Sequence, residues 1–255
     1  MSWATRRKTT YLGAIILFFV IFVGIILYFI FSTTPTCFDK VQNQNETGID
    51  CGGVCEQLCR AEYVAPNLLW TRWSKIKATG LYSIIAYLEN PNIGVGSDGV
   101  NYDFRVYDRA GVLLGERLGR TSIPSNKDFA VFEDQFNLYD KIPARVDFVF
   151  TENIPWKKLQ SKEESITVIS KSPSNMDIKP KVDFVVKNAS LSAIYDIEFV
   201  GILYDIDGNA IAFSKTKIDK IEGQSEKNAV FTWPEPFNKD IYKIEIISKV
   251  LSPLK

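Results

Sequence analysis

The residues of this chain best suited to site chemistry are four cysteines, the only ones among 255 residues. They have the spacing C-x13-C-x3-C-x3-C and are Cys37, Cys51, Cys55 and Cys59. Four thiolates can hold a tetrahedral zinc ion, whereas four thiols can form two disulfides by any of three pairings. The segment lacks the two C-x2-C pairs that zinc ribbons favour. The choice depends on the compartment, because disulfides persist outside the cytoplasm and are rare inside it.

The same segment carries five side chains with oxygen atoms of the kind that calcium prefers. These candidate ligands are Asp39, Asn43, Asn45, Glu46 and Asp50. Their spacing does not follow the EF-hand pattern, and a polar, turn-rich loop without any ion explains them as well. We therefore favour the plain loop and keep the five residues as calcium candidates.

The element before the cysteines settles the compartment. Residues 12–31 read "LGAIILFFVIFVGIILYFIF", and twenty such residues in a helix span ~30 Å, the thickness of the bilayer interior. A cleaved signal peptide would have a shorter apolar stretch and a site such as Ala-x-Ala, which "FSTTPT" does not offer. We predict that 12–31 is an uncleaved transmembrane helix.

Charge predicts the orientation of that helix. Arg6, Arg7 and Lys8 precede it, and the next basic residue is Lys40. By the positive-inside rule, residues 1–11 form a cytoplasmic stub and the chain from Ser32 onward lies outside the cytoplasm. Thiols oxidise there, so we predict that residues 32–62 are a disulfide-rich linker, stapled because few of its residues are apolar.

Composition narrows the function. The chain has no histidine, which removes the commonest general base and the commonest metal ligand. Without the three basic residues of the stub, 27 basic residues stand against 30 acidic ones, a net charge of −3. We therefore expect no catalytic residues, no cofactor and no nucleic-acid partner.

Beyond residue 63 the sequence repeats itself at an offset of 97 to 99 residues. Each copy has a strand ending at an asparagine, a loop, a strand ending in Tyr-Asp, a turn with glycine and another strand. The matched residues are Asn90 and Asn188, Tyr107-Asp108 and Tyr204-Asp205, Gly111 and Gly208, Ile123 and Ile221, and Phe132 and Phe231.

Apolar and polar residues alternate within each copy, as in half-buried antiparallel strands. In "NYDFRVYD", Tyr102 and every second residue to Val106 fall on one face, and the residues between them, such as Asp103, fall on the other. A period near 97 residues fits a sandwich of about seven strands. We predict an all-β protein with two tandem β-sandwiches, at 63–160 and 161–255, plus the N-terminal transmembrane helix. The short link favours end-to-end stacking.

The cysteine segment is similar to a short secreted motif of the form C-x-D-G-x-x-N-x-x-E-T-x-x-D-C-G-G-x-C-x-x-C. This chain has Lys40 in place of the first glycine and one extra residue before Cys59. The motif is found in many extracellular and envelope proteins, beside anchors or between β domains. The resemblance implies no catalytic activity.

The two repeats resemble the FxLYD family and the related late-embryogenesis-abundant type 2 domains. The likeness rests on "FRVYD" at 104–108, "ENPN" at 89–92 and "LYD" at 203–205, with Gly201 where phenylalanine is expected. It implies small immunoglobulin-like sandwiches of the kind found on bacterial envelope proteins and lipoproteins. In that family the motifs build turns and core and mark no active site.

Three groups of residues have both a structural and a functional interpretation, and we favour the structural one for each. The Tyr-Asp pairs are expected to shape hairpins, with the aspartates accepting turn amides. Trp70 and Trp73 are expected to pack in a first strand rather than to form a partner surface. The stretch "FTWPEPF" at 231–237 is expected to be a turn after an edge strand rather than a recognition loop.

The sequence thus predicts a single-pass membrane protein that presents two sandwiches outside the cytoplasm. The expected role is structural or binding, with another envelope protein as the partner. One alternative is a binder of a small or lipidic ligand in an open sandwich cavity. The other is an enzyme with a carboxylate-only or metal-only site, which we do not expect.

Overall fold

The computed structural model describes residues 3–31, 35–76, 79–139, 141–159 and 165–251. The chain divides into two compact units, Met1–Cys55 and Glu56–Lys255. The prediction of an all-β protein with one N-terminal apolar helix is confirmed. The predicted boundary between the sandwiches, at residues 160 and 161, lies outside the described residues. Residues 56–62 of the predicted linker belong to the second unit.

Helix α1 spans Trp3–Phe31 and so begins before the predicted residue 12. The extension is reasonable because residues 3–11 contain neither proline nor glycine. Within α1, the stretch Arg6–Tyr28 is long and apolar enough to cross a membrane. Large apolar side chains from Tyr11 to Tyr28 are exposed, as an apolar helix requires if lipid is to cover it.

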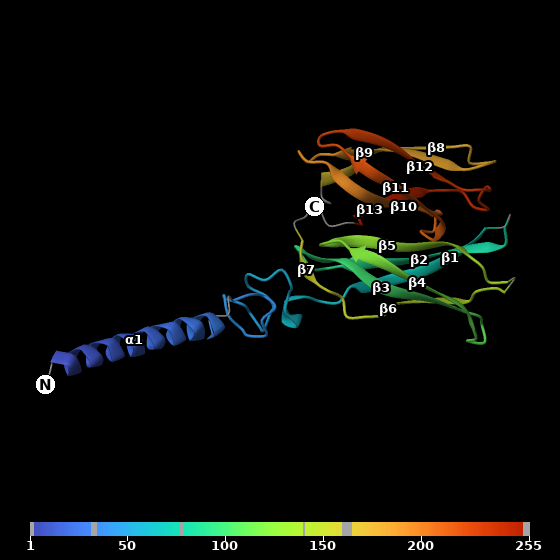
Figure 1. Ribbon diagram of the computed structural model, residues 1–255. Coiled ribbons are helices and arrows are strands. Elements are labelled where there is room, and N and C mark those ends of the chain that lie inside the picture. Colours follow the sequence, from blue (N-terminus) through green and yellow to red (C-terminus); the bar gives the residue numbers. More distant parts are fainter. Residues whose placement is uncertain (1–2, 32–34, 77–78, 140, 160–164, 252–255) are drawn as a thin grey trace. The chain divides into compact units, whose positions relative to one another are not determined.

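The first sandwich consists of two antiparallel sheets, with strand orders β1-β2-β5 and β4-β3-β6 (Figure 1). A short strand β7, Lys157–Lys158, pairs with the start of β3. The other strands are β1 Asn67–Ile76, β2 Leu81–Asn90, β3 Val95–Tyr107, β4 Leu113–Ile123, β5 Lys127–Phe136 and β6 Arg145–Phe150.

The second sandwich repeats this topology, with strand orders β8-β9-β12 and β11-β10-β13. Its strands are β8 Ile166–Ser174, β9 Lys181–Asn188, β10 Ile194–Tyr204, β11 Ala210–Ile221, β12 Glu226–Thr232 and β13 Lys243–Val250. Among the described residues, the first sandwich has seven strands with β7 included and the second has six, close to the expected number of about seven.

Each sandwich encloses its own apolar core. Phe104 and Phe129 are fully buried in the first core, and Phe184 and Phe199 in the second. Tyr102, Phe104 and Val106 point inward as their alternation predicts. Asp103 differs from the expectation for an outward-facing residue, because it is buried and pairs with Arg105 at 2.6 Å.

The two sandwiches pack face to face, so the expectation of end-to-end stacking was wrong. The sheet β1-β2-β5 of the first lies against the sheet β11-β10-β13 of the second, which gives four stacked layers (Figure 1). A third apolar cluster fills the space between them: Ile85, Tyr87, Ala130 and Phe132 from the first sandwich, and Val200, Ile202, Phe213 and Ile247 from the second. The paired sheets are not equivalent, because β2 corresponds to β9 and not to β10.

Buried asparagines brace the same loop in both sandwiches. Asn90 donates to the carbonyl oxygens of Val95 at 2.8 Å and Pro124 at 2.6 Å. Asn188 donates to the carbonyl oxygens of Ser192, Ile221 and Glu222 at 2.8–3.2 Å. Each side chain therefore ties the loop that follows its strand to the end of β4 or β11. Asn90 and Asn188, which correspond in the sequence repeat, therefore also occupy equivalent positions in the two sandwiches.

The predicted correspondence between Phe132 and Phe231 was wrong. Phe132 lies between the sandwiches, whereas Phe231 lies inside the second core. The strand registers give an offset of 98 residues, since Ala86 pairs with Val131 and Phe184 pairs with Ala229. Phe231 also explains the glycine at position 201, because a Cβ there would lie 2.8 Å from its ring.

Candidate functional site

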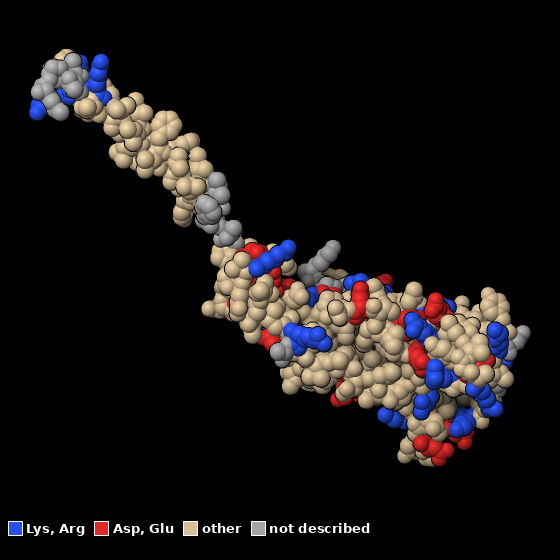
Figure 2. Space-filling model, turned by 90° about the horizontal axis from the view of Figure 1, so that it is seen from below, with Lys and Arg blue, Asp and Glu red and all other residues tan. Residues whose placement is uncertain are grey.

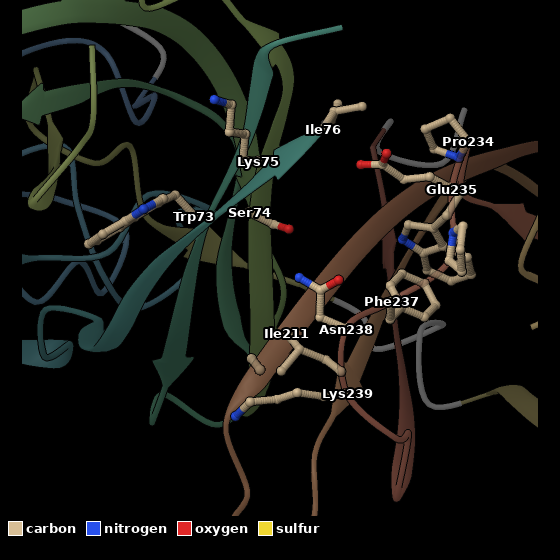
Figure 3. A pocket seen from close by; sticks show the side chains of 13 residues that line it. Trp73, Ser74, Lys75, Ile76, Ile211, Pro234, Glu235, Phe237, Asn238 and Lys239 are labelled. Carbon is tan, nitrogen blue, oxygen red and sulfur yellow. The ribbon is translucent and has the colours of Figure 1, made fainter. Parts of the chain in front are cut away.

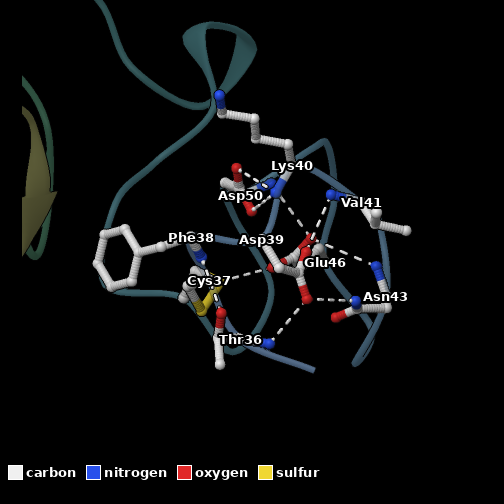
Figure 4. Close-up of a disulfide and its surroundings, with 10 residues drawn as sticks. Thr36, Cys37, Phe38, Asp39, Lys40, Val41, Asn43, Glu46 and Asp50 are labelled. Atoms are coloured by element: carbon white, nitrogen blue, oxygen red, sulfur yellow. Dashed lines mark hydrogen bonds between the residues drawn. A yellow bond between two sulfur atoms is a disulfide. The ribbon is translucent and has the colours of Figure 1, made fainter. Parts of the chain in front are cut away.

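The cysteine segment is held by disulfides. Cys37 is bonded to Cys55, and Cys51 and Cys59 are also disulfide-bonded (Figure 4). A zinc ion would need thiolates, which the bonded sulfur atoms cannot supply. The sulfur atoms of Cys37 and Cys55 lie near the carboxylate of Glu46, with 3.1 Å between Glu46 Oε1 and Cys55 Sγ. We therefore interpret Cys37, Cys55 and Glu46 as a disulfide packed against a carboxylate and not as a zinc site.

Carboxylates organise the loop around that crosslink (Figure 4). Asp39 accepts hydrogen bonds from the amides of Thr36 and Val41 at 3.0 and 2.9 Å, and from Asn43 Nδ2 at 2.9 Å. The bond from Asn43, followed by those from the two amides, lowers the pKa of Asp39. Ionised Asp39 thus serves as an acceptor for main-chain donors that an irregular loop would otherwise leave unpaired.

The other calcium candidates have similar surroundings. Both carboxylate oxygens of Asp50 lie 3.0 Å from the amide of Lys40, and Glu46 Oε2 accepts from the amides of Asn43 and Asp50. Asn45 adopts a left-handed conformation with φ of 65°. These contacts engage the carboxylates of Asp39, Glu46 and Asp50 without an ion. In the described part of the chain, the buried Oδ1 of Asn43 has no hydrogen-bond partner, and calcium binding stays a prediction.

The Tyr-Asp pairs shape the hairpins, as expected. Asp108 Oδ1 accepts the amides of Ala110 and Val112, and Asp205 Oδ1 accepts those of Asp207 and Asn209, at 2.8–3.1 Å. The glycines of these turns, Gly111 and Gly208, have φ of 81° and 78°, a conformation that disfavours a side chain. The two aspartates therefore stabilise the hairpin turns by accepting main-chain hydrogen bonds.

The two tryptophans of β1 face opposite sides of their sheet. Trp73 packs against the first core, and Trp70 stacks on Tyr87 at the margin of the contact between the sandwiches, with ring centroids 4.9 Å apart. Trp73 thus bears out the packing interpretation. Trp70 also packs within the protein, but against the contact between the sandwiches. That position was not predicted, because the sheet that faces it is distant in the sequence.

A cleft of about 300 Å³ opens where the sandwiches meet (Figure 3). Ser74 and neighbouring residues of β1 form one wall, and the loop after β12, with Asn238 and Lys239, forms the other. The loop is anchored by Trp233, which is buried and donates from Nε1 to the carbonyl oxygen of Phe213 at 2.9 Å. The "FTWPEPF" stretch is thus both a turn after a strand and one wall of the cleft.

Two more hollows lie along the same junction. One, of about 830 Å³, shares Ile76 and Pro234 with the cleft of Figure 3. The other, of about 370 Å³, is lined by aromatic side chains that include Trp70 and Tyr204. The sequence suggested a cavity inside a sandwich as one alternative, whereas these three sites lie between the sandwiches. They were not predicted, because they exist only where two sheets distant in the sequence are brought together.

The exposed surface of the second unit carries charges of both signs. Figure 2 views it from the side of β3, β4 and β6, and Lys and Arg side chains are interspersed there with Asp and Glu. A one-sign stripe of the kind that tracks a phosphate backbone does not cover this face.

No protein-family model matches the sequence, and no curated protein matches it. Among solved structures, the crystal structure of red sea bream transglutaminase aligns with 72% of this chain at 8% identity and a TM-score of 0.24. The aligned region covers 31% of that chain. A similarity this low carries no argument about fold or activity.

Proposed function

We propose that this chain is a single-pass membrane protein that presents a paired-sandwich module outside the cytoplasm to bind another component of the cell envelope. Residues 12–31 would cross the bilayer, residues 1–11 would lie in the cytoplasm, and the cysteine segment would separate the module from the lipid. The resemblance of the repeats to FxLYD and late-embryogenesis-abundant type 2 domains agrees with such a role.

One observation carries the proposal. The exposed apolar side chains of α1 extend over a length that matches a bilayer, in a chain whose four cysteines are all oxidised. A surface that is apolar on every side is covered by lipid in a stable protein. Disulfides persist on the oxidising side of a membrane. Together these two features support the topology that the N-terminal charges predict.

A binding role has more support than catalysis. Large side chains fill the two sandwich cores, and the three hollows described above lie at the junction between the sandwiches. The carboxylates near them are engaged: Asp205 with Lys239, and Glu245 with Tyr204. Such an arrangement suits recognition by a rigid surface.

Protease accessibility tests the topology. The full chain, with one epitope tag at each end, is expressed in cells whose wall barrier has been removed. External protease should destroy the C-terminal tag and spare the N-terminal tag until the cells are lysed. The reverse pattern would overturn the proposal. Crosslinking in native membranes, followed by mass spectrometry, should then recover a partner attached to residues of the second unit.

A further inference from the structure

The aromatic hollow of about 370 Å³ at the junction is built by both sandwiches. Trp70 and Tyr87 come from β1 and β2 of the first sandwich, whereas Tyr204, Tyr242 and Glu245 come from the second. Its volume lies within the range of small-ligand pockets, about 300–1,000 Å³, and such pockets occur preferentially where domains meet. Neither sandwich could form it alone.

The aromatic rings of this pocket differ in exposure. Trp70 is held against Tyr87 with 13° between the ring planes, which fixes its orientation. Tyr242 has 72% of its surface exposed, although its amide is fixed by a 2.8 Å hydrogen bond to the carbonyl oxygen of Tyr204. The main chain of Tyr242 is therefore held in place beside the pocket, and its ring is accessible for stacking.

Polar groups converge on the same pocket. Glu245 Oε2 accepts a hydrogen bond from the Tyr204 hydroxyl at 2.7 Å, and Glu245 Oε1 lies 3.5 Å from the Tyr87 hydroxyl. Burial, followed by the hydrogen bond and the negative charge of Glu245, raises the pKa of Tyr204, so its hydroxyl stays protonated at neutral pH. The pocket therefore offers acceptors on Glu245 and oxygen lone pairs on the phenols.

The pocket also contains a donor that balances its charge. Lys243 Nζ lies 3.6 Å from Glu245 Oε2 and 5.0 Å from the centre of the Tyr204 ring. The second carboxylate of the pocket, Asp205, is paired with Lys239. Each of the two carboxylates that line the pocket therefore has an ammonium partner, so the lining favours neither an organic cation nor an anion. A third carboxylate, Asp128, lies behind the pocket and accepts a hydrogen bond from the Tyr87 hydroxyl at 3.0 Å.

We propose that this pocket binds a neutral carbohydrate, with a sugar ring stacked on Tyr242 and its hydroxyl groups hydrogen-bonded to Glu245 and Lys243. A sugar ring has apolar C–H faces that pack on an aromatic ring, and hydroxyls that both donate and accept. The pocket supplies a partner for each of these features. The inference rests on the proposed function, since it names the envelope component that the module binds.

The test uses the full chain in lipid nanodiscs on an array of bacterial, fungal, plant and animal glycans. We expect saturable binding to neutral glycans. Tyr242→Ala should weaken it about fivefold or more, since a stacked ring contributes on the order of 1 kcal/mol or more. The matched control is Tyr139→Ala, because Tyr139 is 80% exposed in the corresponding loop of the first sandwich and lies outside the pocket.

Tetramethylammonium and Lys243→Ala separate a sugar site from a cation site. The unsubstituted chain should not bind tetramethylammonium, because Lys243 pairs with Glu245, and loss of this donor should weaken glycan binding. An unchanged urea midpoint for each variant excludes unfolding as the cause. Absence of glycan binding, full glycan binding by Tyr242→Ala or Lys243→Ala, or tetramethylammonium binding by the unsubstituted chain would each overturn the inference. The topology assay is independent of these results, so a failure here would leave the membrane-anchored module standing.

Discussion

Lys249 Nζ lies 3.0 Å from Glu198 Oε1, and both side chains are buried where the two sandwiches meet. Lys249 also donates across the junction to Thr121 Oγ1 at 2.7 Å and to the carbonyl oxygen of Ala130 at 3.1 Å. A buried ion pair contributes little net stability, but it is costly to leave half-formed. These contacts therefore select one register between the sheets, and with it the shape of the junction pockets.

Lys249→Ala tests this contact. The variant leaves Glu198 buried, with Lys215 Nζ at 3.6 Å as its remaining cation, so we expect the free energy of unfolding to fall by about 3 kcal/mol. Urea unfolding of the full chain in detergent, followed by tryptophan fluorescence, measures it. Lys181→Ala is the control, because its pair with Asp183 is exposed and should contribute less than about 1 kcal/mol. Equal effects of the two substitutions would contradict this account.

The two corresponding asparagines, Asn90 and Asn188, should contribute similar amounts to the free energy of unfolding. Asn90→Ala and Asn188→Ala each leave buried carbonyl oxygens without their donors, so each should lower the free energy of unfolding by about 2 kcal/mol. Asn228→Ala, at an exposed position of β12, should change it by less than about 0.5 kcal/mol. A large loss in only one sandwich would show that the two loops are not braced alike.

The cysteine segment should depend on its crosslinks. Alkylation of membrane-purified protein should label no thiol before reduction and four after it. The double variant Cys37→Ser/Cys55→Ser should be cleaved by trypsin after Lys40 at least about tenfold faster, because a disulfide over such a loop contributes about 3 kcal/mol. Cleavage after Arg109, in the β3–β4 turn, should not change. Four reactive thiols in unreduced protein would refute the predicted compartment.

Acid should weaken the β10–β11 turn. The hydrogen bond from Lys239, together with those from Asn209, lowers the pKa of Asp205 from 3.8 to about 2. A carboxylate with a lowered pKa stabilises the folded state above its unfolded pKa, and this contribution disappears as the pH falls from about 4 to about 2. The chain should therefore be more stable than Asp205→Asn at pH 5 and equal to it near pH 2. Urea midpoints at intermediate pH values measure the difference, and a constant gap would count against Asp205.

The features that the sequence predicted are local ones. Helix α1 follows from an uninterrupted apolar stretch, and the hairpins follow from Asp108 and Asp205 placed three residues before a glycine. In each case the residues that interact lie within a few positions of one another, so their spacing in the sequence is enough to predict the local structure. The inward alternation of β3 is predictable for the same reason, because side chains point to opposite faces at every step along a strand.

The contact between the sandwiches is reflected in the sequence by strands that have apolar residues on both faces, which a simple apolar-polar alternation does not explain. Ile84 and Ile85 are consecutive in β2 and both fully buried, one in the first core and the other at the junction. Val200 and Ile202 lie on the face of β10 opposite to Phe199 and Leu203. Strands that are apolar on both faces are typical of layers covered on both sides. The sequence therefore indicates that β2 and β10 are covered.

What covers them was decided only by the tertiary structure. The partner of Ile85 is a sheet that begins more than a hundred residues away, and an apolar face does not specify which other apolar face it meets, because the hydrophobic effect has no direction. The pairing of Lys249 with Glu198 and the meeting of Trp70 with Tyr204 follow from that choice of sheet. The sequence by itself thus determined an apolar helix and two β repeats, and the packing of two non-equivalent sheets created the pockets between them.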